Sequence, residues 1–307
     1  MKILITGSRG MVGKNISNFL SANNFKLLTP SSVELNLLNR DAVDKYIKLN
    51  SPDFVIHCAG IVGGIQANID NPVKFLVNNT QIGINIIMSC YANGVKNFIN
   101  MGSSCMYPRN AKNPLKENAI LSGELEPTNE GYAIAKINST KLCEYINREN
   151  SNCRYKTIIP CNLYGKYDKF DLMNGHMIPA VINKIHEAKI NNKESVSIWG
   201  NGHARREFMY VEDLADFTMY AINNFSKMPQ NINVGLGYDY SINEYYKIIA
   251  DVIGYHGIFT YDTSKPIGMK QKLIDDTELK KFGWCSKFNI KLGIKITYDY
   301  YLNEVIK

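Results

Sequence analysis

The chain has 307 residues, of which 45% are hydrophobic and 21% charged, and this composition excludes a disordered, collagen-like or low-complexity protein. Lys and Arg outnumber Asp and Glu by 35 to 28, which gives a net charge of +7. The basic residues are scattered singly or in pairs, so we expect neither a nucleic-acid-binding arm nor a polybasic membrane anchor, and a small anionic ligand is favoured.

Apolar runs typical of strands alternate with stretches of helical spacing along the first half of the chain. The strands are expected at residues 2–6, 26–28, 54–58, 98–101 and 155–160, and the helices at 14–20, 40–49, 72–92 and 132–147. This alternation predicts an α/β fold of the Rossmann type, a doubly wound parallel sheet with helices on both faces.

The alternation weakens beyond Asn162, which indicates a second domain. We predict a dinucleotide-binding domain of residues 1–162 plus about 207–236, and a smaller, discontinuous α/β domain of about 163–206 plus 237–307. Ligands of such folds bind at the carboxyl ends of the strands, in the cleft between the two domains.

The seven cysteines form no CxxC pair and no metal-ligand spacing, so we expect free thiols, no metal site and a reducing compartment. The apolar run at the N-terminus is too short for a signal peptide, and about 18 consecutive apolar residues occur nowhere. The sequence therefore predicts a cytoplasmic protein without a membrane span.

Gly7, Gly10 and Gly13 form a loop between the first expected strand and the first expected helix. Gly7 suits a tight turn, Gly10 lets the backbone approach a pyrophosphate, and Gly13 permits close packing of the helix, so we predict a dinucleotide site. Arg9 can pair with a 2′-phosphate, and no carboxylate follows the second strand, which favours NADP(H) over NAD. The remaining expected cofactor contacts are Met11, Val12 and Ala59.

Tyr132 and Lys136 stand four residues apart in an expected helix and therefore share one of its faces. A cation beside a phenol lowers the phenol's pKa, which suits Tyr132 for giving a proton to a carbonyl oxygen as hydride arrives. Taken alone, this common spacing is better explained by a tyrosine packed on a lysine stem. Ser103, just past the strand at 98–101, favours the catalytic interpretation because its hydroxyl can bond the same oxygen.

The loop at 6–13, the serines at 103 and 104 and the Tyr132/Lys136 pair resemble the extended short-chain dehydrogenase/reductase superfamily. Further segments are similar to the GDP-L-fucose synthase family, up to about Asp275: residues 62–65, 103–108, 126–130, 162–165, 176–180 and 206–208. The resemblance implies NADPH-dependent reduction of the C4 ketone of a GDP-4-keto-sugar, with epimerisation at C3 and C5.

The same resemblance implies a role for each matching residue. Ser103 orients the ketone, Tyr132 protonates its oxygen, and Lys136 tunes Tyr132 and contacts the nicotinamide ribose. Cys105 and His176 match the acid/base pair of epimerisation, which needs groups that remove and return the protons next to the ketone. The positions that match the substrate site are Ser104, Asn162, Lys184, Trp199 and Arg206, the last three for the guanine nucleotide and its diphosphate.

Three positions depart from the family pattern. Ser32 stands near the place of a second arginine for the 2′-phosphate, and Lys184 replaces an arginine, which is not conservative where phosphate is held bidentately. The Lys-Pro-Asp-Gly type of segment appears at 265–268 with Ile267 in place of the acid. These changes surround the cofactor and substrate, so the sequence defines the reaction type better than the sugar.

Other functions stay open at this point. The chain can be a C4 reductase without epimerase activity, acting on a GDP-4-keto-heptose, or a catalytically silent dinucleotide-binding module. A cysteine hydrolase using Cys105 and His176 is more remote, because it leaves the glycine loop and Tyr132 without a role.

The helices expected at 72–92 and 132–147 have apolar residues on more than one face: Ile84, Ile86, Ile87, Ile134, Ile137 and Leu142. Because the matching helices of the superfamily form a four-helix dimer interface, we expect a homodimer.

Overall fold

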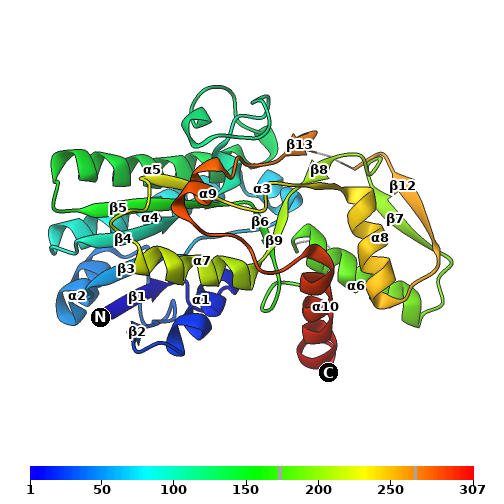
Figure 1. The fold of residues 1–307 in the computed structure, drawn as a ribbon, viewed down its shortest axis with the longest axis horizontal. Helices are drawn as coiled ribbons and strands as arrows, with labels where there is room; N and C mark the ends of the chain where they lie inside the picture. Colours follow the sequence, from blue (N-terminus) through cyan, green and yellow to red (C-terminus); the bar gives the residue numbers. More distant parts are fainter. Residues whose placement is uncertain (172–174, 266–267) are drawn as a thin grey trace.

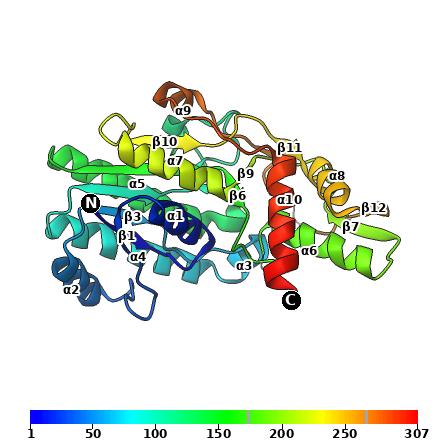
Figure 2. The same ribbon diagram turned by 60° about the horizontal axis from the view of Figure 1, so that its bottom comes forward.

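The computed structural model describes residues 1–171, 175–265 and 268–307, so the Pro266–Ile267 part of the substituted segment lies outside the described residues. The chain forms a larger part around a central sheet and a smaller part beside it, at the right in Figure 1. The view in Figure 2 shows the same division, with α10 lying between the sheet and the outer helices of the smaller part.

A six-stranded, fully parallel sheet with the order β10-β5-β4-β3-β1-β2 organises the larger part. Its strands are β1 (Lys2–Thr6), β2 (Lys26–Leu28), β3 (Phe54–His57), β4 (Asn97–Met101), β5 (Arg154–Pro160) and β10 (Asn231–Val234). The predicted doubly wound α/β fold is confirmed. The strand order reverses at β1, which has β2 on one side and β3 on the other, and ligands of open α/β sheets bind at such a switch point.

Helices cover both faces of this sheet (Figure 1). One face packs on α1 (Met11–Ser21) and α7 (Val211–Asn223), and the other on α2 (Arg40–Asn50), α4 (Pro72–Ala92) and α5 (Glu130–Glu149). Ile3 and Ile5 pack in the hydrophobic cluster that includes residues of α1 and α7, and Leu4 packs in the cluster that includes residues of α2 and α4. Successive strand residues point to opposite faces of the sheet. Burial on both faces explains why these strands are continuous apolar runs.

The smaller part has its own hydrophobic cluster, formed by α6 (Met177–Ile190), α8 (Ile242–Ile253), α10 (Ile290–Tyr300) and the strands beside them. Its strands are short and paired as β7 (Ser195–Trp199) with β12 (Ile258–Asp262), and as β11 (Tyr240–Ser241), β8 (Arg205–Arg206) and β13 (Gln271–Lys272). At the junction, β6 (Asn162–Tyr164) pairs in parallel with β9 (Phe208–Tyr210). The remaining short elements are α3 (Ile65–Asp70), α9 (Thr277–Phe282), the 3-10 turns η1 (Ser104–Met106), η2 (Glu117–Ala119) and η3 (Pro127–Asn129), and the π-helical turn η4 (Tyr301–Val305).

The predicted domain boundaries stay a prediction, and the hydrophobic clusters differ from them in two places. Ile274, Leu279 and Trp284, expected in the second domain, pack in the cluster of the central sheet. Phe208 and Tyr210, expected in the first domain, pack in the cluster of the smaller part. The chain crosses between the two parts more often than the sequence pattern indicates.

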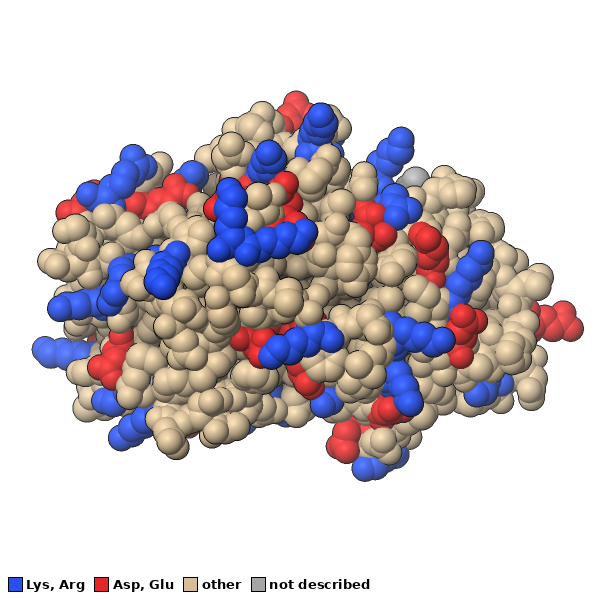
Figure 3. All heavy atoms as spheres, in the orientation of Figure 1, with Lys and Arg blue, Asp and Glu red and all other residues tan. Residues whose placement is uncertain are grey.

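On the face of the molecule shown in Figure 3, Lys and Arg side chains are spread over the whole surface and interspersed with Asp and Glu. The net charge of +7 is therefore not gathered into one patch on this face. Among the described residues, no helix is long and apolar enough to cross a bilayer.

Candidate active site

The glycine loop joins β1 to α1 at the switch point of the sheet, and Gly10 is the N-cap of α1. Gly7 has a φ of +71°, and a Cβ there would lie 2.6 Å from the Ala59 nitrogen, so the loop packs directly on the segment after β3. A Cβ on Gly13 would lie 2.3 Å from the Gly7 oxygen, whereas one on Gly10 would meet nothing closer than 3.5 Å. Gly7 and Gly13 thus serve the fold of the loop, and exposed Gly10 leaves its backbone accessible to a phosphate.

Arg9 is exposed beside Gly10, and Met11 and Val12 begin α1 as half-buried residues. A helix N-terminus presents free N–H groups and the positive end of the helix dipole to a ligand. The residues present therefore fit a dinucleotide whose pyrophosphate lies on the start of α1, next to the cation of Arg9.

Ser103 lies directly after β4, where its hydroxyl accepts a hydrogen bond from the Cys105 N–H at 3.2 Å. Tyr132, in the first turn of α5, is hydrogen-bonded to Ser103. Burial raises the pKa of Tyr132, the charge of Cys105 adds to this, and the Ser103 bond opposes it, with a net increase. The structure thus brings the Ser103 and Tyr132 side chains together, with Tyr132 as a protonated phenol.

Lys136 is buried one turn further along α5. Its Nζ lies 5.8 Å from the centre of the Tyr132 ring and donates a hydrogen bond to the Met101 oxygen at 2.7 Å. Burial lowers the pKa of Lys136 to about 8, although the nearby Cys58 and Cys105 oppose the shift. We expected the lysine cation to lower the pKa of Tyr132, and this prediction was wrong. The pKa is raised, because desolvation of the phenol outweighs the interactions that lower it.

The half-buried Cys105 thiol lies between two nitrogen donors that the sequence analysis did not identify. Asn129 Nδ2 donates to its sulfur at 3.2 Å, and Lys272 Nζ lies 3.7 Å from it, with Lys272 itself only 7% exposed. Asn129 belongs to one of the segments of the resemblance, but Lys272 is 167 residues away from Cys105 along the chain. An ammonium group and an amide donor thus contact the sulfur of Cys105.

His176 is the N-cap of α6 and contacts Asp168 instead of Cys105, with 3.2 Å between Nδ1 and Oδ1. Burial alone lowers the pKa of His176, but the hydrogen bond and charge of Asp168 outweigh it, so the pKa is raised. Sequence reasoning missed Asp168. The described residues contain no group of three or more His, Cys, Asp and Glu side chains placed to hold a metal ion.

The expected substrate contacts lie on five different elements: η1, β6, α6, β7 and β8. Ser104 is buried, and half-buried Asn162 donates to the Glu207 oxygen at 2.8 Å. Lys184, on α6, donates to the Ser197 oxygen of β7, and burial lowers its pKa.

Trp199 ends β7, and its indole is partly exposed with Lys265 Nζ 5.6 Å above the ring. Burial lowers the pKa of Arg206, on β8, while the charges of Glu126 and Cys105 oppose the shift, so this guanidinium is electrostatically coupled to Cys105. The structure thus gathers Ser103, Cys105, Tyr132 and Lys136 closely, and Arg206 beside them.

The family model of the NAD dependent epimerase/dehydratase family matches residues 3–235, which include the glycine loop and the Ser103, Tyr132 and Lys136 positions. The chain belongs to the NAD dependent epimerase/dehydratase family. A member of this family binds a nicotinamide dinucleotide, and the glycine loop is the part of this chain that fits one.

Within this family, the chain is 61% identical to GDP-L-colitose synthase from Yersinia pseudotuberculosis, over 99% of each chain. It is 48% identical to GDP-L-fucose synthase from Azorhizobium caulinodans, over 99% of this chain and 98% of the relative. The solved structure of a GDP-mannoheptose C4 reductase from Campylobacter jejuni with NADP bound has a TM-score of 0.88 and 34% identity, and the match covers 98% of each chain. The resemblance to the GDP-L-fucose synthase family is confirmed.

Proposed function

We propose that this protein is an NADPH-dependent oxidoreductase that reduces the C4 ketone of a GDP-4-keto-sugar and also inverts the carbons next to that ketone. The arrangement of Ser103, Tyr132 and Lys136 at the carboxyl end of β4, with Cys105 beside them, is the observation that supports it most. The relatives named GDP-L-colitose synthase and GDP-L-fucose synthase support the class of substrate.

Reduction needs a proton for the ketone oxygen, and NADPH supplies the hydride when it is bound. Tyr132 donates this proton, since its raised pKa keeps the phenol protonated until the alkoxide forms. Ser103 orients the oxygen through its hydroxyl. The Lys136 ammonium lies close enough to the phenol ring to stabilise the tyrosinate that proton transfer leaves behind.

The choice of NADP(H) depends on Arg9, an exposed cation beside Gly10 whose charge also acts on Glu34 and which can pair with a 2′-phosphate. The heptose reductase solved with NADP bound supports this choice. Replacement of Arg9 by Ala is expected to weaken NADPH binding and leave NADH binding unchanged.

Inversion at a carbon next to the ketone needs one group that removes a proton and a second that returns it to the opposite face. Cys105, with Asn129 and Lys272 at its sulfur, is arranged as the base, and His176, with Asp168 at Nδ1, as the acid. Incubation with GDP-4-keto-6-deoxymannose in heavy water without NADPH tests this half of the proposal. We expect deuterium at C5 and C3; its absence at both would show that the protein is a reductase only.

A second candidate substrate is a GDP-4-keto-3,6-dideoxyhexose, favoured by the 61% identity to GDP-L-colitose synthase. Colitose has no hydroxyl at C3, so C5 is then the only stereocentre beside the ketone to invert. The three candidate substrates are distinguished by comparing turnover on GDP-linked 4-ketones of a 6-deoxyhexose, a 3,6-dideoxyhexose and a heptose. Preference for the heptose would favour the reductase without epimerase activity that the sequence left open.

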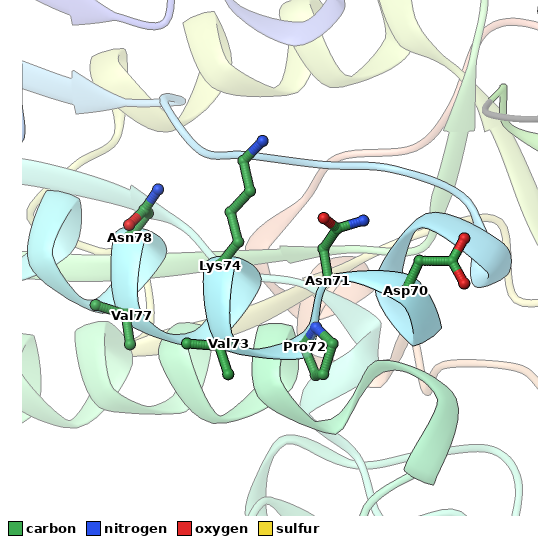
Figure 4. Close-up of a pocket in the computed structure, with 7 residues that line it drawn as sticks. All are labelled: Asp70, Asn71, Pro72, Val73, Lys74, Val77 and Asn78. Atoms are coloured by element: carbon green, nitrogen blue, oxygen red, sulfur yellow. The ribbon is translucent and has the colours of Figure 1, made fainter.

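We further propose that two copies pair through the outer faces of α4 and α5. Four large apolar side chains on these helices are exposed: Val73, Val77, Ile134 and Tyr145. A shallow hollow lies beside the first two, and Figure 4 shows Val73 and Val77 on one side of α4 with Lys74 and Asn78 on the other. Exposed apolar side chains on two neighbouring helices are typical of an interface.

A further inference from the structure

We infer that Asp168 is a positioning residue for proton return: it holds His176 so that Nδ1 faces the carboxylate and Nε2 is the atom that gives a proton to the substrate carbon. This inference rests on the proposed epimerase function and adds to it a residue outside the Ser103, Tyr132, Lys136, Cys105 and His176 set.

The two residues before Asp168 contact the middle of α1, the same helix that begins at the glycine loop. Asn15 Nδ2 donates to the Lys166 oxygen at 3.0 Å, and Asn18 Nδ2 donates to the Tyr167 hydroxyl at 3.1 Å. Lys14 Nζ also lies 4.1 Å from the centre of the Tyr167 ring. The segment that leads to Asp168 is therefore attached to the dinucleotide-binding helix.

His176 approaches from the other part of the molecule, as the N-cap of α6. Its Nδ1 lies 3.2 Å from Asp168 Oδ1, and because a carboxylate only accepts, Nδ1 carries the proton in this contact. Asp168 is 3% exposed at its side chain whereas His176 is 38% exposed, so the imidazole is accessible from outside and the carboxylate is not. A carboxylate that orients an imidazole in this way fixes its tautomer.

The second carboxylate oxygen, Oδ2, is buried and has no hydrogen-bond partner among the described residues. Oδ1 also accepts a hydrogen bond from the Lys169 N–H at 2.8 Å, so the carboxylate contacts both the His176 side chain and its own neighbouring backbone. The charged groups that act on the imidazole are Asp168, which favours the imidazolium, and Lys169, which opposes it. A buried carboxylate in direct contact outweighs an exposed lysine, so the pair maintains His176 as a proton donor.

The proton transfers balance without a further reactant. The C–H bond next to the ketone breaks, its proton moves to the Cys105 sulfur, and its electron pair forms the enolate. The Nε2–H bond of the His176 imidazolium then breaks, and the proton joins the same carbon from the opposite face. Exchange with solvent returns one proton to His176 and removes one from Cys105.

The first test measures the imidazole itself. In protein labelled with ¹⁵N-histidine, the His176 signals are identified by their loss in His176→Gln and titrated in the wild type, in Asp168→Asn and in Lys169→Gln. We expect protonated Nδ1 in the neutral wild-type ring, a pKa lower by about one unit or more in Asp168→Asn, and no decrease in Lys169→Gln. An unchanged His176 titration in Asp168→Asn would overturn the inference, whatever the substrate.

The second test measures deuterium uptake from heavy water into GDP-4-keto-6-deoxymannose across pH, without NADPH. We expect the alkaline limb of the Asp168→Asn profile to move to lower pH by about the shift seen in the titration, while reduction of an already inverted ketone keeps its rate. A limb that stays in place would overturn the role of Asp168. Absence of uptake by the wild type would instead overturn the proposed epimerase function, and with it proton return by His176, while its reduction activity remains measurable.

Discussion

Tyr132 and Cys105 lie within one site but are predicted to serve different steps. Tyr132→Phe removes the hydroxyl that protonates the ketone oxygen, so we expect NADPH oxidation to fall by about 10²-fold or more. Cys105→Ser keeps Ser103 and Tyr132 in place, and we expect it to reduce an already inverted ketone at close to the wild-type rate. An equal loss of that reduction in both variants would contradict the division of roles.

Lys136 is predicted to make the rate of reduction depend on pH. Burial lowers its pKa to about 8, so its ammonium is present below that pH and is lost as the pH rises through 8, whereas the raised pKa of Tyr132 keeps the phenol protonated over the same range. We expect kcat/KM for reduction to fall above about pH 8. Lys136→Arg retains a cation there, and the alkaline limb should move upward; a limb that does not move would assign it to another group.

The local motifs of the site could be predicted because each lies within a few residues of a strand or helix end. Ser103 follows β4, and Tyr132 and Lys136 share one turn of α5. Lys272 could not be predicted in this way, since its contact to Cys105 depends on how a segment 167 residues away returns to the site. Asp168 is only eight residues from His176, but it lies in a loop, whose course no periodic pattern predicts. Burial likewise decided the direction of the Tyr132 pKa, and spacing contains no information about burial.

At the scale of elements, five of the six sheet strands were predicted because each contains a run of apolar residues, whereas β10 was not. Its Asn231 and Asn233 alternate with apolar residues, so this segment contains no such run. Asn233 is tolerated in the interior because its side chain accepts from the Tyr107 hydroxyl at 2.5 Å and donates to the Leu115 oxygen at 2.9 Å. A buried amide that is fully paired does not interrupt a strand.

The glycine loop gives a prediction about one element, the turn from β1 into α1. In Gly10→Ala the new Cβ meets nothing closer than 3.5 Å, so we expect the Tm to fall by only about a few degrees. We expect NADPH binding to weaken by roughly tenfold, because the methyl group lies where the pyrophosphate is proposed to bind. Gly13→Ala places a Cβ 2.3 Å from the Gly7 oxygen and should lower the Tm more. Thermal unfolding and NADPH fluorescence titrations measure both; undiminished binding by Gly10→Ala would contradict the placement of the pyrophosphate.

At the scale of the whole molecule, the proposed homodimer makes the outer face of α4 and α5 an interface. Val77→Asp places a charge on that face, and we expect it to convert a dimer into a monomer of 34.8 kDa in light scattering after size exclusion. Leu49→Asp is the matched control, because Leu49 is 79% exposed on α2, outside the proposed interface. A wild-type monomer, or dissociation by the control as well, would exclude this interface.

The glycine loop and the Ser103, Tyr132 and Lys136 side chains lie at the carboxyl ends of strands of the parallel sheet, and the proposed hydride transfer to C4 needs both. The most direct test supplies GDP-4-keto-6-deoxymannose with NADPH deuterated at C4 of the nicotinamide ring. We predict one NADPH consumed per sugar and one deuterium at C4 of the GDP-linked product. No consumption with this ketone or with its 3,6-dideoxy and heptose counterparts, or deuterium found elsewhere than C4, would contradict the account.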